Sequence, residues 1–86
     1  MSLMETINRA VETKVDELNK KVEAEQAEAQ RKIAAADNEK AKADIQSEVK
    51  ANIEELQSKI EDVKSKLSEA KDAGEEGLKD IRDSLS

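Results

Sequence analysis

The sequence predicts an all-α protein: a long antiparallel two-helix hairpin of coiled-coil type, with a short C-terminal helical extension, that associates into a four-helix bundle. The 86 residues include no Pro and only two Gly, Gly74 and Gly77, and strong helix formers dominate the rest. Apolar residues recur at spacings of three and four in both halves of the chain, as on the buried side of a helix. Residues 34–44, between the halves, contain no Leu, Ile or Val. We therefore expect the chain to turn there and to form one domain over residues 1–86.

The first helix is expected over about residues 3–36. Ser2 and Glu5 have the spacing of a capping box in which Ser2 is the N-cap. The stripe that this helix should bury comprises Ile7, Val11, Val15, Leu18, Val22 and Ile33. Met4 and Ala29 continue this stripe, and when Gln26 is included, the spacings follow an 11-residue repeat, which is close to the period of a straight helix.

The second helix is expected over about residues 39–73. Its stripe comprises Ile45, Val49, Ile53, Leu56, Ile60, Val63 and Leu67. At about 100° per residue, one uninterrupted helix would place the two stripes on opposite sides. A turn near residues 37–38 removes this conflict and pairs stripe residues whose numbers sum to 78, such as Val22 with Leu56. Asp37 and Asn38 suit the turn because both tolerate the left-handed conformation and can cap the following helix.

Two amides, Gln26 and Asn52, also fall in this register. In one interpretation they meet across the hairpin, where a buried polar pair would fix the register at some cost in stability. In the other, Ile53 takes the core position and Asn52 faces water.

The chain after the second helix is expected to form a helical extension over about residues 75–85. Gly74 and Gly77 should bend or briefly break the helix, and Leu78, Ile81 and Leu85 continue the apolar spacing beyond them. In the register above, this segment extends past the start of the first helix. The three side chains are therefore predicted to be an apolar overhang that another subunit covers.

The composition excludes several kinds of chemistry. The chain has no His, Cys, Phe, Trp or Tyr, so it lacks imidazole and thiol groups for catalysis or zinc binding and aromatic rings for stacking bases. Lys and Arg number 15 against 21 Asp and Glu, and the net charge of −6 opposes phosphate binding. Residues 72–83 have the Gly of a calcium loop, but Gly74 stands where a ligand is needed. We expect no catalytic, cofactor-binding or metal-binding residues and no nucleic-acid partner.

Two functions fit these features of the sequence. The first is a non-enzymatic structural or interaction module that forms a homo-oligomer, by preference a two-fold dimer, or binds a helix of another protein. The second rests on the 11-residue spacing and the abundance of Ala, Lys and Glu. In these features the chain is similar to late-embryogenesis-abundant and apolipoprotein-like repeats, which implies an amphipathic protectant or lipid-surface protein. Membrane insertion is not expected, because no apolar run approaches ~20 residues, and we expect a cytoplasmic location.

Overall fold

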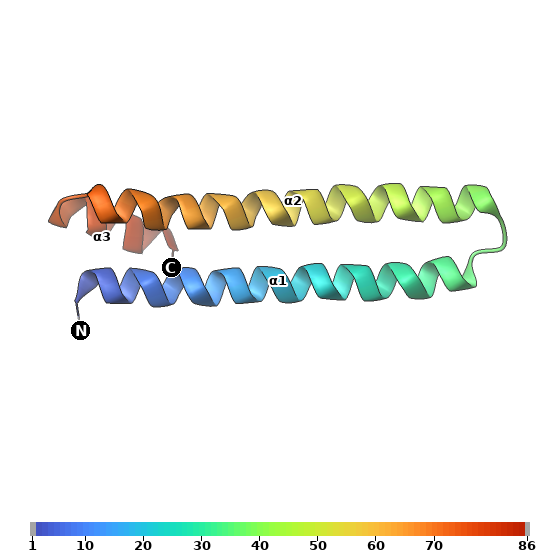
Figure 1. Cartoon of the computed structure of the whole chain (residues 1–86), viewed down its shortest axis with the longest axis horizontal. Coiled ribbons are helices and arrows are strands. Elements are labelled where there is room, and N and C mark those ends of the chain that lie inside the picture. The colour runs from blue at the N-terminus through green and yellow to red at the C-terminus, as the bar shows by residue number, and fades with distance from the viewer. Residues whose placement is uncertain (1, 86) are drawn as a thin grey trace.

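The computed structural model describes residues 2–85 and contains three helices (Figure 1). Helix α1 spans Leu3–Ala35, α2 spans Glu39–Asp72 and α3 spans Glu75–Leu85. Helices α1 and α2 lie side by side and antiparallel along their whole length, which confirms the predicted hairpin. The molecule is a rod that measures 57 × 18 × 15 Å. Helix α3 folds back over the open end of the hairpin, where both chain termini lie.

Short polar side chains begin the two long helices. The Ser2 hydroxyl accepts a hydrogen bond from the Glu5 backbone N–H at 3.1 Å, as the predicted cap requires. At α2 the Asn38 carbonyl oxygen Oδ1 accepts from the Ala41 N–H at 2.8 Å. Each side chain satisfies one of the backbone donors that a first helical turn leaves unpaired.

Both long helices end one residue earlier than expected. Ala36 and Ala73 are C-caps with extended backbone, at φ −73°, ψ 136° and φ −85°, ψ 147° respectively. The N–H group of each still bonds to the carbonyl oxygen three residues earlier, at 3.2 and 3.3 Å. Among residues 2–85 no residue has a positive φ. The turn between the long helices therefore does not use the left-handed conformation expected of Asp37 and Asn38; Asn38 is extended and serves as the cap of α2.

The register of the hairpin agrees with the predicted pairing to within one residue. The Asn52 side-chain nitrogen donates to a Glu25 carboxylate oxygen at 3.3 Å, and their numbers sum to 77. At the far end of the hairpin, Ala29 and Val49 line the same groove. Hydrophobic packing between two stripes, rather than the turn sequence alone, is the physical reason for this agreement, because a slip would expose part of each stripe.

The expectation that the C-terminal segment overhangs the first helix is wrong. The extended backbone at Ala73 lets the chain reverse, and α3 packs against the first turns of α1 and the last turns of α2. Leu85 is only 5% exposed and belongs to a buried cluster with Ile7, Val11 and Ala70. Leu78 and Ile81 pack against this cluster. The overhang residues thus complete a three-helix core within their own chain.

Candidate interaction surface

The apolar stripe is covered to different depths along the hairpin. At the open end, where α3 adds a third helix, Ile7 is fully buried and Val11 is 4% exposed. Farther along, two helices alone enclose the stripe, and Ala29 and Ile60 are buried there. The other stripe residues are only half-buried: Val15, Leu18, Val22, Ile33, Ile45, Val49, Ile53, Leu56, Val63 and Leu67. This partly covered stripe is the candidate interaction surface.

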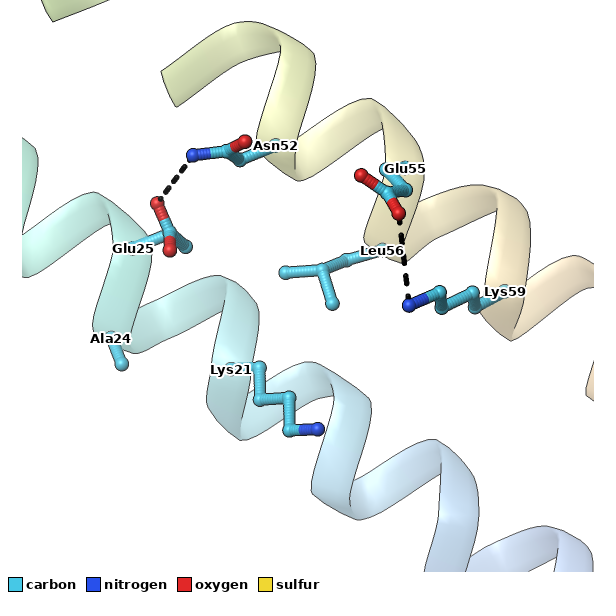
Figure 2. Close-up of a pocket in the computed structure, with 7 residues that line it drawn as sticks. All are labelled: Lys21, Ala24, Glu25, Asn52, Glu55, Leu56 and Lys59. Carbon is cyan, nitrogen blue, oxygen red and sulfur yellow. Dashed lines mark hydrogen bonds and ion pairs between the residues drawn. The ribbon is translucent and has the colours of Figure 1, made fainter. Parts of the chain in front are cut away.

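One open groove runs along the α3 side of the hairpin. It begins where α3 ends, beside Leu85 and Leu18, and continues past Lys21 and Lys59. Figure 2 shows its middle section, where Leu56 points from α2 toward α1. Charged side chains border the groove along most of its length: Lys14, Glu17, Lys21, Glu25, Glu28, Lys32, Glu48, Glu55, Lys59, Asp62 and Lys66. The groove is therefore a narrow apolar seam between two charged, hydrated borders.

The polar contact across the hairpin differs from the predicted pair. Asn52 is half-buried and hydrogen-bonds to Glu25 (Figure 2), whereas Gln26 is exposed. Ile53 is also half-buried, so Asn52 and Ile53 share the side of α2 that faces α1. Glu25 escaped prediction because it lies directly beside the stripe position taken by Gln26. A one-residue change at the edge of a stripe rotates a side chain by about 100°.

A second open groove lies on the opposite side of the hairpin. Its apolar floor is formed by Ala29, Ile33, Val49 and Ile53, and its borders by Gln46, Lys50, Glu54 and Gln57. Two of these four border residues are uncharged amides, in contrast to the charged borders on the α3 side. Burying the borders of this second groove would therefore cost less desolvation free energy than burying the charged borders on the α3 side.

Among residues 2–85 the ion pairs are short-range and exposed. Three join residues of neighbouring turns, Glu28 with Lys32 at 3.5 Å, Glu39 with Lys42 at 3.6 Å and Glu55 with Lys59 at 3.8 Å. The fourth joins the adjacent residues Arg82 and Asp83 at 3.1 Å. Pairs of this kind add at most about 0.5 kcal/mol each to a helix, so they support the helices without binding one helix to another.

Neither metal nor membrane chemistry is evident in the part of the chain that the structure describes. Residues 2–85 bring together no group of three or more acidic side chains able to hold a metal ion. The stretch with a weak likeness to a calcium loop is largely the helix α3, so its acidic residues are distributed around a helix. No helix within residues 2–85 has both the length and the apolar character needed to cross a membrane.

Comparison with known protein families, with curated proteins and with solved structures finds no match. The half-buried stripe and its two grooves are thus the features from which a function can be argued.

Proposed function

We propose that this protein is a non-enzymatic structural module that self-associates through its amphipathic helices. The observation that carries the proposal is the change in burial along one stripe. Ile7 and Val11 are buried where three helices meet. Where only two meet, Ala29 and Ile60 are buried, but most stripe residues, among them Val22, Ile33 and Ile53, are half-buried. Full burial of an exposed aliphatic side chain is worth roughly 1.5–3 kcal/mol. A half-buried one would gain about half of this, so further helices packed on the two-helix part would be stabilising.

The size of the core supports the same proposal. The described chain has one cluster of buried side chains at the open end, and it contains no aromatic residue. Small single cores commonly gain stability from oligomerisation. Two hairpins would make a four-helix arrangement, in which each stripe meets side chains from more than one neighbour.

The absence of imidazole, thiol and aromatic groups from the sequence supports a non-enzymatic role. Catalysis by carboxylates alone requires an enclosed cleft that shifts their pKa values. The grooves of this hairpin are open along their length, which is the geometry of a packing surface.

Sedimentation equilibrium over a wide range of protein concentration, with circular dichroism on the same samples, tests the proposal. We expect a strongly helical protein that melts cooperatively, with a mass that rises to that of the dimer. A helical monomer at every concentration would refute self-association and favour a partner helix from another protein. A largely unfolded chain that becomes helical only with lipid vesicles would favour the amphipathic protectant or lipid-surface alternative.

A further inference from the structure

Helices α2 and α3 are separated by a junction of only two residues, Ala73 and Gly74. The apolar residues on the two sides of the junction keep one helical phase: Leu67, Ala70, Leu78, Ile81 and Leu85. At about 100° per residue, a helix continuous from α2 into α3 would carry these five side chains within a sector of about 80°. In the structure the chain reverses at the junction instead, and α3 runs back along the hairpin (Figure 1).

The reversal leaves backbone donors at the start of α3 without a partner. Helices α1 and α2 each begin with a capping side chain, whereas Gly74, which precedes α3, has no side chain to serve as a cap. Within residues 2–85 the N–H groups of Glu75, Glu76 and Gly77 form no hydrogen bond, and the first α3 bond runs from the Leu78 N–H to the Gly74 carbonyl at 3.0 Å. A continuous helix would pair all three with carbonyl groups four residues earlier.

The reversal also brings two backbone positions unusually close together. A Cβ added at Gly77 would lie 2.9 Å from the Cβ of Ala73, whereas side chains four residues apart in a helix have Cβ atoms about 5–6 Å apart. The reversed chain therefore requires glycine at position 77, and a continuous helix does not. A Cβ at Gly74 would meet nothing within 4 Å, so no packing around this residue holds the junction in its reversed form.

We infer that two copies of this chain exchange α3: the junction straightens into a continuous helix, and each α3 packs on the open end of the other hairpin. The exchange rests on the proposed self-association and identifies the segment through which two copies associate. With the open ends facing each other, an incoming α3 runs from the open end toward the turn, which is the direction of the chain's own α3 (Figure 1). It can therefore cover Ile7, Val11 and Ala70 as the chain's own α3 does, while the junction gains backbone hydrogen bonds in both chains.

Other features of the junction oppose the straight form and keep the single chain closed in dilute solution. Glycine lowers the stability of a helix interior, and the junction region contains both glycines of the chain. Glu75 and Glu76 suit the start of a separate helix. The continuous helix would set Lys71 beside Glu75 but also Asp72 beside Glu76, so the charge pairs favour neither form. Association at higher concentration then shifts the balance by mass action, and exchange of a terminal element is a low-cost route to a dimer.

Hydrogen exchange measured by NMR at low and high protein concentration tests the exchange of α3. In the closed chain the amides of Glu75, Glu76 and Gly77 lack hydrogen bonds within residues 2–85 and should exchange rapidly. In the exchanged dimer they lie inside a continuous helix, and their exchange should slow by about tenfold or more. The Lys40 amide is the internal control, because it lies in the first turn of α2 in both forms. A dimer whose junction amides exchange as fast as those of the monomer would overturn the inference and leave self-association intact.

Variants of the junction, compared by sedimentation equilibrium, provide a second test. Gly77→Ala should tighten the dimer at least about tenfold, because it disfavours the reversed chain and favours the continuous helix in each of two copies. Glu75→Pro should weaken it at least about tenfold, because proline is accepted in the first turn of a helix and breaks a helix interior. Glu75→Ala, the matched control, removes the same charge and should not weaken the dimer. An E75P dimer as tight as the E75A dimer would overturn the inference, whereas a monomer at every concentration, in G77A as well, would also refute the proposed function.

Discussion

The three-helix end should carry most of the stability of a single chain, and this can be measured by comparing Ile7→Ala with Ile33→Ala. Ile7 is fully buried between α1, α2 and α3, whereas Ile33 is half-buried near the turn. Truncation of a buried isoleucine to alanine costs about 2–5 kcal/mol. A half-buried isoleucine loses roughly half the transfer free energy and leaves no closed cavity, so about 1 kcal/mol is expected.

Urea unfolding followed by circular dichroism at 222 nm is the appropriate assay. At protein concentrations where sedimentation shows a monomer, Ile7→Ala should lower the free energy of unfolding by about 1–4 kcal/mol more than Ile33→Ala does. Small domains are stable by only about 5–15 kcal/mol, so a loss of about 2–5 kcal/mol should lower the urea midpoint of the Ile7 variant clearly. The conservative Ile7→Val control should cost about 0.5–1.5 kcal/mol.

Protein concentration adds a second measurement to the same pair of variants. If the dimer covers the two-helix part, the cost of Ile33→Ala should rise with concentration, because the isoleucine becomes more deeply buried on association. The cost of Ile7→Ala should stay constant, since Ile7 is already fully buried in one chain. Equal costs for both variants in the monomer would refute the assignment of stability to the three-helix end.

The helix ends and α3 give three further predictions. Gly77→Ala should destabilise the docked α3 and lower the urea midpoint, because the added Cβ would lie 2.9 Å from the Ala73 Cβ. Gly74→Ala should change the midpoint little, because a Cβ there meets nothing within 4 Å. Similar midpoint shifts in both variants would contradict the close contact. Asn38→Ala should lower the free energy of unfolding by about 1 kcal/mol through loss of the cap of α2. Asn38→Ser should keep nearly the original stability, and Asp37→Ala is a neighbouring control. An unchanged free energy of unfolding for Asn38→Ala would show that the cap is not needed. Truncation after Ala73 should lower the melting temperature and increase hydrogen exchange in the first turns of α1, because Ile7 and Val11 lose their cover, and unchanged exchange there would mean that α3 does not dock in solution.

The hairpin could be predicted because its determinants are local and repeated. Each stripe repeats its spacing over several turns, so single exceptions such as Gln26 do not change the conclusion. The position of the turn followed from residues 34–44, which contain no branched aliphatic residue and include Asn38, a good N-cap. Pairing in the hairpin then followed from the need to bury both stripes together.

The placement of α3 could not be predicted in the same way. The spacing of Leu78, Ile81 and Leu85 showed that one side of this segment is apolar, but not which surface it meets. Its direction depends on the backbone of Ala73 and Gly74, where a few dihedral angles decide between continuation and reversal. Alanine carries no side-chain signal for either choice. The Asn52–Glu25 contact was missed for a related reason, because the sequence pattern defines the edge of a stripe only to within one residue.

Docking of α3 explains why the core is closed within a single chain at one end of the rod and not at the other. At about 1.5 Å per residue, the 11 residues of α3 cover about 16 Å, roughly a third of the length of α1. An isolated helix this short is marginal in water, so α3 depends on the hairpin for its structure while it buries Ile7 and Val11. Between the end of α3 and the turn of the hairpin, the stripe of α1 and α2 continues with no third helix against it. The chain thus has one buried cluster at one end and a mostly half-buried stripe along the rest, with Ala29 and Ile60 as its buried members, and this remaining apolar surface is what the proposed self-association would cover.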